Sequence, residues 1–246
     1  MFRREKVEDD EVVVMNYIST NTSIPIPRVL GSGTCKVGPY IILEFSEGKP
    51  LSEYLRASQD DMVISTLLNF DIDDSILRRA YRIMAEILLE LSRCRFSTIG
   101  GLAQDSSTTI VATELALTFN VNGLVRLGNL PPKKLSQTCF STATAYLVSL
   151  AEDHLHHLES QHNEGPFPLF CDDLRPSNVL LDEDLRLLAV IDREFSYAAP
   201  AEFTHCSPWW LLLARPESRK AGFDDFLAHY IPRQTQTVFL EILREC

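Results

Sequence analysis

The chain has 246 residues, with 23 basic and 34 acidic side chains and a formal net charge of −11 at neutral pH. This excess of acid argues against a general nucleic-acid-binding protein, because contacts to phosphates require a basic face. Apolar residues make up 45% and charged residues 23%, close to the globular average, which excludes disordered, collagen-like and coiled-coil classes. The length predicts one large domain or two lobes that share a cleft.

The cellular location is predicted from the absence of a membrane-spanning segment and of a secretory signal. No stretch approaches the roughly 18 consecutive apolar residues of a membrane span. Residues 2–10 carry positive charge but are not followed by an apolar segment, so no secretory signal is predicted. Six cysteines are scattered without a CxxC pair, which favours reduced thiols. We therefore expect a cytoplasmic protein with no membrane or nucleic-acid partner, while the sequence does not indicate its oligomeric state.

The N-terminal part predicts a helix followed by a hairpin. Apolar residues over 6–18 fit a helix, and acids concentrate in its first half, where the helix dipole favours them. Two β-rich runs, 28–33 and 40–45, flank several glycines and predict an antiparallel hairpin. A nucleotide-cradling GxGxxG loop is the alternative, but Lys36 stands where its third glycine belongs.

A break at 47–50 separates a predicted small lobe, residues 1–46, from a predicted large lobe, residues 47–246. Helical spacing of apolar residues predicts core helices over 76–94 and 136–162, the first with Asp73 or Asp74 as N-cap. The remaining large-lobe predictions are loops with one hairpin over 96–134, short strands at 169–170, 179–181 and 187–191, and broken helices over 208–246.

The strongest chemical signal lies between residues 171 and 192. Asp173 and Asn178 stand five positions apart, and Asp192 follows a predicted hairpin, so three oxygen-bearing side chains can meet at one point. Phosphoryl transfer needs such a set, because one carboxylate takes the proton of the acceptor hydroxyl while an amide oxygen and a second carboxylate hold Mg²⁺. The alternative is two solvated turns that happen to be acidic.

These residues carry a resemblance to a known family. Residues 173–182, DLRPSNVLLD, and 190–194, VIDRE, resemble the catalytic loop (HGDLHPGN) and the metal-binding segment (IDWE) of the aminoglycoside phosphotransferase family. Residues 11–18 resemble its small-lobe helix, residues 24–31 its IPVPRVLG connector, and residues 38–45 the strand and hinge beside its adenine site. The resemblance implies an α+β, protein-kinase-like fold with a truncated small lobe and a mostly helical large lobe.

The resemblance also implies an activity and a set of site residues. The activity is ATP- and Mg²⁺-dependent phosphorylation of a hydroxyl on a small molecule. Asp173 would be the general base, and Asn178 and Asp192 the magnesium ligands. Glu11 would pair with a phosphate-binding lysine, and the backbone of residues 44–46 (Glu44, Phe45 and Ser46) would contact adenine.

Several departures from the family pattern support a second hypothesis. The family's phosphate-covering loop and its lysine-bearing strand should precede the first helix, and we expect both to be missing. Cys171, Asp172 and Arg193 replace a His, a Gly and a Trp of the motifs, and adjacent acids can raise a pKa and disturb metal placement. A catalytically inactive kinase-like binding or regulatory protein, or an incomplete gene product, is therefore the alternative.

Two further groups are interpreted as structural. His154, His156, His157 and His162 could suggest a metal site, but only His154 and His157 share a helix face, so a solvated helix end is favoured. Trp209 and Trp210 could line a pocket, but an aromatic pair before three leucines is more typical of a core.

Overall fold

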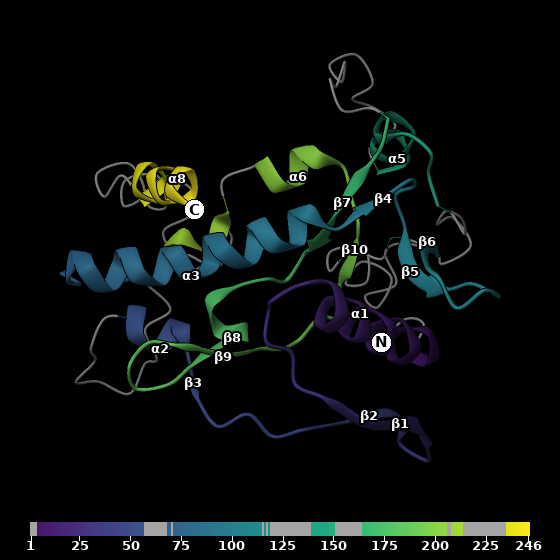
Figure 1. The fold of residues 1–246 in the computed structure, drawn as a ribbon, viewed down its shortest axis with the longest axis horizontal. Helices are drawn as coiled ribbons and strands as arrows, with labels where there is room; N and C mark the ends of the chain where they lie inside the picture. Colours follow the sequence, from purple (N-terminus) through teal and green to yellow (C-terminus); the bar gives the residue numbers. More distant parts are fainter. Residues whose placement is uncertain are drawn as a thin grey trace. The chain divides into compact units, whose positions relative to one another are not determined.

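The computed structural model describes residues 4–56, 68–69, 71–114, 116, 118, 139–150, 164–205, 208–213 and 235–246. These residues form α-helices together with small antiparallel sheets, which confirms a mixed α+β structure (Figure 1). The chain divides into two units. Unit 1 holds residues 1–45, 90–174 and 192–205, and unit 2 holds residues 46–89, 175–191 and 206–246.

The first helix of unit 1, α1 (Arg4–Asn21), confirms the predicted N-terminal helix. Its apolar face buries Val14, Met15 and Ile18, which are three and four residues apart and so lie on one side. This helix contacts the strands β1 (Val29–Cys35) and β2 (Gly38–Leu43) (Figure 1). The helix ends where side chains take over its last carbonyls, since Thr22 Oγ1 donates to the Ile18 carbonyl at 2.8 Å.

Strands β1 and β2 form the predicted antiparallel hairpin. Their register pairs Cys35 with Gly38, so the turn holds two residues, Lys36 and Val37. Gly38 has a φ of 129°, a conformation that a side chain would strain, so the hairpin requires glycine there. Gly31 and Gly33 lie within β1 and Gly38 begins β2, so these glycines belong to a hairpin rather than to a loop around a nucleotide.

The central sheet of unit 1 is built around β7 (Phe167–Cys171). This strand pairs with β4 (Arg95–Phe96) on one side and with β10 (Ser196–Ala198) on the other. A separate hairpin of β5 (Gly101–Gln104) and β6 (Ile110–Glu114) confirms the hairpin predicted within 96–134.

Unit 1 also contains the short helices α5 (Ala143–Leu150) and α6 (Ala201–His205). Aromatic rings from its strands and helices form a core, with ring centroids 5.5–6.5 Å apart. The rings belong to Phe140, Tyr146, Phe170, Tyr197 and Phe203.

The long helix predicted over 136–162 begins later than expected. Residues 139–142 are not helical, because Phe140 bridges to Ile99 and Thr142 bridges to Glu164. Thr142 then caps α5, with its Oγ1 accepting a hydrogen bond from the Ala145 N–H at 3.2 Å. Residues 151–162, which include the four histidines, lie outside the described residues.

Unit 2 is assembled around the helix α3 (Asp74–Arg93), whose last turn belongs to unit 1. Asp73 caps this helix as predicted, since its Oδ1 accepts a hydrogen bond from the Ser75 N–H at 2.8 Å. The other elements of unit 2 are β3 (Lys49–Pro50), α2 (Leu51–Leu55), the 3₁₀ turn η3 (Pro176–Asn178), β8 (Val179–Leu181), β9 (Leu187–Val190), the 3₁₀ turn η4 (Trp209–Leu212) and α8 (Thr235–Glu245). Strand β8 pairs with β3 and β9, which confirms the strands predicted at 179–181 and 187–191.

An aromatic cluster joins α3, η4 and α8. Tyr81 of α3 makes edge contacts with Trp210 and Phe239, and the Trp210 and Phe239 rings lie 5.4 Å apart. The Tyr81 hydroxyl donates to the Leu211 carbonyl at 2.8 Å. Trp210 is therefore a core residue, as the sequence predicts.

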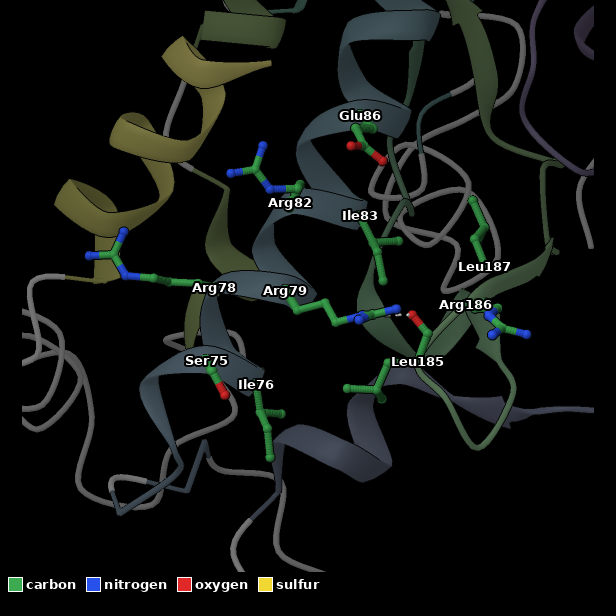
Figure 2. Close-up of a pocket in the computed structure, with 10 residues that line it drawn as sticks. All are labelled: Ser75, Ile76, Arg78, Arg79, Arg82, Ile83, Glu86, Leu185, Arg186 and Leu187. Atoms are coloured by element: carbon green, nitrogen blue, oxygen red, sulfur yellow. Dashed lines mark hydrogen bonds between the residues drawn. The ribbon is translucent and has the colours of Figure 1, made fainter.

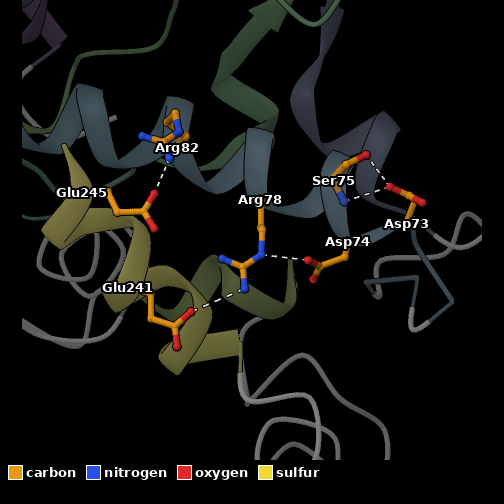
Figure 3. A network of polar contacts seen from close by, with 7 residues as sticks. All are labelled: Asp73, Asp74, Ser75, Arg78, Arg82, Glu241 and Glu245. Atoms are coloured by element: carbon orange, nitrogen blue, oxygen red, sulfur yellow. Dashed lines mark hydrogen bonds and ion pairs between the residues drawn. The ribbon is translucent and has the colours of Figure 1, made fainter.

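Ion pairs at the surface also join α3 to α8, and one further pair lies within α3. Arg78 contacts Asp74 at 2.8 Å and Glu241 at 3.5 Å, and Arg82 contacts Glu245 at 2.5 Å (Figure 3). All these groups are exposed, so solvent screens them and their contribution to stability is small. In the part of the chain that the structure describes, no helix has the length and apolar character needed to cross a bilayer.

Candidate active site

The segment that carries Asp173 begins where β7 ends. Backbone hydrogen bonds fix its course, since the Asp172 N–H donates to the Phe195 carbonyl at 3.0 Å and the Leu174 N–H donates to the Cys171 carbonyl at 3.2 Å. Asp173 is only 4% exposed. A carboxylate is seldom buried unless other groups stabilise it, so Asp173 does not belong to an ordinary solvated turn.

Asn178 ends the 3₁₀ turn η3 in unit 2. Its N–H donates to the Arg175 carbonyl and its carbonyl accepts from the Ile191 N–H, both at 2.9 Å. The side chain is 5% exposed, so this amide is also buried rather than solvated. The register of β8 and β9 sets Asn178 opposite Ile191, and Asp192 is the next residue along the chain.

Asp192 begins the last segment of unit 1 and has a left-handed backbone, with a φ of 63°. Few residues other than glycine adopt this conformation, and aspartate is among those that tolerate it best. Residues held in such conformations concentrate at functional sites. Thr108, Leu185 and Leu213 have the same left-handed conformation, so the backbone at Asp192 alone does not mark a site.

Unit 1 brings Glu11 and Asp192 together. Burial raises the pKa of the Glu11 carboxyl, the negative charge of Asp192 raises it further, and a hydrogen bond from the Arg193 N–H partly opposes both. Among the described residues Glu11 forms no ion pair with a lysine or arginine. The structure thus sets Glu11 beside a second acid.

The segment expected to contact adenine links β2 of unit 1 to unit 2. Residues 44–48 form no helix or strand, and the Phe45 side chain is 88% exposed. The Glu44 N–H donates to the Arg28 carbonyl at 2.9 Å, and its carboxylate pairs with the Arg28 guanidinium at 3.6 Å. Both the backbone N–H and the side chain of Glu44 are therefore engaged with Arg28.

The candidate metal ligands are an amide and a carboxylate. Within the described ranges, no group of three or more His, Cys, Asp and Glu side chains is arranged to hold a metal ion. The oxygens of Asn178 and Asp192 are hard ligands of the kind that Mg²⁺ takes, usually together with water and phosphate oxygens. Their chemistry fits magnesium, and it would not suit zinc, which prefers nitrogen and sulfur.

Two features of the structure were missed by the sequence analysis. One is the burial of Arg193, which is 1% exposed although arginine is among the residues least often buried. The other is a cavity of about 740 Å³ in unit 2, between α3 and the β8–β9 turn (Figure 2). No local pattern in the sequence signals the cavity, because it forms between α3 and residues 185–187, which are distant in the chain.

The arginines at this cavity already have local partners. The Arg79 Nε donates to the Leu185 carbonyl at 3.1 Å, as Figure 2 shows, while Arg78 and Arg82 pair with acids of α8. Arg186 pairs with Asp184 at 3.3 Å. No predicted site residue lines the cavity.

Comparison with known proteins gives only distant similarities. Neither a scan against models of protein families nor a search of curated protein sequences gives a match. Among solved structures, the chain is similar to the GDP complex of wild-type aminoglycoside 2′-phosphotransferase-IIIa, with 16% identity, 98% of this chain and 72% of that chain covered, and a TM-score of 0.45.

A second similar structure is the GDP and kanamycin complex of APH(2″)-IIia, with 14% identity, 98% of this chain and 83% of that chain covered, and a TM-score of 0.46. These structural neighbours are aminoglycoside phosphotransferases at low sequence identity. A similarity of this degree does not assign the chain to their family.

Proposed function

We propose that this protein is an ATP-dependent phosphotransferase that acts on a hydroxyl of a small molecule. The observation that carries the proposal is the burial of Asp173 and Asn178, at 4% and 5% exposure, within a sequence that resembles a phosphotransferase catalytic loop. Solvated acidic turns, the alternative explanation of the motif, would leave these side chains in water.

Asp173 acts as the general base in this proposal. Its carboxylate orients the acceptor hydroxyl and takes its proton as the hydroxyl oxygen attacks the terminal phosphorus of ATP, the bond from that phosphorus to the bridging oxygen breaks, and ADP leaves. Positioning supplies most of the rate because the transition state is loose. The backbone hydrogen bonds that fix the Asp172–Leu174 segment support this role.

The side-chain oxygens of Asn178 and Asp192 would hold Mg²⁺. When bound, the ion neutralises charge on the nucleotide phosphates. Glu11 lies close enough to Asp192 for their charges to interact, so a second carboxyl group stands beside this candidate metal ligand. The backbone at Glu44, Phe45 and Ser46 contacts adenine.

A catalytically inactive binding or regulatory protein is the second candidate. The observation that favours it is the pair Cys171 and Asp172, which stands beside the base where the family has a histidine and a glycine. Cys171 is buried at the end of β7, opposite Ser196. Such a protein would bind nucleotide and would not transfer phosphate.

Calorimetric titration with ATP, with and without Mg²⁺, tests the proposal. Wild-type protein should bind ATP more tightly with magnesium, and Asp192→Ala should abolish that magnesium dependence. Asp184→Ala is the matched control, because Asp184 is an exposed acid in the β8–β9 turn of unit 2. Absence of binding at millimolar ATP would refute the proposal.

Turnover then separates the two candidates. ADP release with a panel of hydroxyl acceptors should occur with the wild type and be lost in Asp173→Asn, which should still bind ATP. Nucleotide binding without turnover on any acceptor would favour the inactive protein.

A further inference from the structure

The turn that follows Asp192 contains a buried arginine without a partner. Arg193 is the largest fully buried side chain that the structure describes, and none of its three guanidinium nitrogens has a hydrogen-bond partner among the described residues. A guanidinium stays protonated under all ordinary conditions, so it cannot avoid the cost of burial by losing its charge. A buried cation of this kind requires an anion.

The backbone of Arg193 is held at both ends. Its N–H donates to the Glu11 carboxylate, and its carbonyl accepts from the Ser196 N–H at 3.1 Å. The left-handed residue Asp192 precedes it. The backbone from which the Arg193 side chain extends is therefore held in a fixed turn.

A second polar group of the same turn is also unsatisfied. The Ser196 hydroxyl is buried and has no hydrogen-bond partner among the described residues. Four polar side-chain atoms within four residues thus lack partners, and all four can donate hydrogen bonds. Eight buried side-chain atoms lack a partner among the described residues, and four of them belong to this one turn. Buried polar groups in proteins are nearly always paired, so the turn can take an acceptor that the described residues do not supply.

We propose that the Arg193–Ser196 turn binds a phosphate group. The guanidinium presents a planar fork of donors that matches the oxygens of a phosphate. The Ser196 hydroxyl is a further unpaired donor of the same turn. The anion site follows from the unpaired donors alone. The assignment of the bound group to the phosphates of ATP rests on the proposed function, because Asp192, the candidate magnesium ligand, is the adjacent residue.

The unpaired charge of Arg193 should lower the stability of the ligand-free protein. Arg193→Met removes an unpaired buried charge and keeps a side chain of similar length, and replacing buried charges with apolar groups often stabilises a protein. The variant should therefore unfold at a higher temperature than the wild type when no ligand is present. A structural role for Arg193, through an acid outside the described residues, would give the opposite result.

Thermal unfolding and calorimetry with magnesium complexes of ATP and tripolyphosphate, and with adenosine, test the site. The wild type should be stabilised by both phosphate ligands, and tripolyphosphate should bind Arg193→Met at least about tenfold more weakly. Adenosine binding should be equal in the two proteins. Arg193→Lys, which keeps the charge without the fork, should bind tripolyphosphate with intermediate affinity. Arg186→Met, at an exposed arginine, is the control and should match the wild type.

The outcomes separate this inference from the proposed function. Unchanged tripolyphosphate affinity in Arg193→Met, or a lower unfolding temperature without ligand, would overturn the phosphate site even if ATP is turned over. Tripolyphosphate binding that depends on Arg193, in a protein that does not bind ATP, would support the site and refute the phosphotransferase.

Discussion

Phe239→Ala should destabilise unit 2 more than any change to the surface charges that join the same helices. Phe239 is 3% exposed and makes edge contacts with Tyr81 and Trp210, at ring-centroid distances of 5.9 and 5.4 Å. Truncating a buried phenylalanine to alanine costs about 3–5 kcal/mol, because apolar burial is lost and a cavity remains. This is a large part of a total stability of about 5–15 kcal/mol.

Urea unfolding followed by tryptophan fluorescence measures this cost, since Trp210 reports directly on the cluster. With a urea dependence of about 1–3 kcal/mol per molar, the midpoint should fall by about 1 M or more. Leu240→Ala is the matched control on the same helix, because Leu240 is 38% exposed, and it should cause a much smaller fall.

The surface ion pairs provide the opposing test. The double variant Glu241→Gln and Glu245→Gln removes the acids that pair with Arg78 and Arg82 (Figure 3). Exposed pairs of this kind contribute little and are screened by salt. If the double variant lowered the midpoint more than Phe239→Ala, packing would not be what holds α8 to α3, and the reasoning would be wrong.

Two further predictions concern backbone features. Gly48→Ala should destabilise the fold by about 1–3 kcal/mol in urea unfolding, because a Cβ at Gly48 would lie 2.9 Å from the Leu181 carbonyl oxygen, whereas Gly31→Ala, which meets nothing within 4 Å, should have little effect. Equal costs at the two glycines would contradict the steric argument. Asp73→Ala should lower the thermal midpoint at neutral pH, because hydrogen bonds from Ser75 hold the pKa of the Asp73 carboxyl below its usual range. The ionised Asp73 cap stabilises the protein fully above the usual aspartate pKa, and this stabilisation is lost as the pH falls through the lowered pKa. Asp73→Asn can still accept the hydrogen bonds but does not titrate, so the thermal midpoint of this variant should lose that pH dependence. A pH profile equal to that of the wild type would contradict the argument.

Local patterns in the sequence predicted most of the elements. Helical spacing identified α3 and its cap at Asp73, and glycines between β-rich runs identified the β1–β2 hairpin. Short apolar runs around an acidic turn identified β8 and β9. These features depend on residues close together in the chain, so the sequence contains their causes.

Features that depend on distant residues were not predictable. Residues 139–142 fit a helical pattern, but bridges from Phe140 to Ile99 and from Thr142 to Glu164 hold them extended. The division into units also combines distant segments, since unit 1 joins residues 1–45 to residues 90–174. Local propensity is overridden when tertiary pairing satisfies the same backbone groups.

Arg193 shows the same limit at the candidate site. The sequence identified it as a substitution in a family motif, but whether an arginine is buried and unpaired depends on every element around it. The sequence showed only that an arginine stands next to Asp192, a candidate metal ligand. Its burial and its unpaired guanidinium are visible only in the structure.

Three unfavourable features occur together in one short turn. Asp192 has a left-handed backbone, Arg193 holds a buried charge and Ser196 holds a buried hydroxyl, all within five residues. The pairing of β10 with β7 runs through the backbone, so it does not depend on the Ser196 hydroxyl, and Arg193 lies outside β10. Locally unfavourable groups that the fold can do without are typical of binding sites, where a ligand supplies the missing partner. If Arg193→Met stabilises the ligand-free protein, the difference in stability measures the cost of burying the unpaired charge. Ligand binding then explains Arg193 better than a role in holding the fold together.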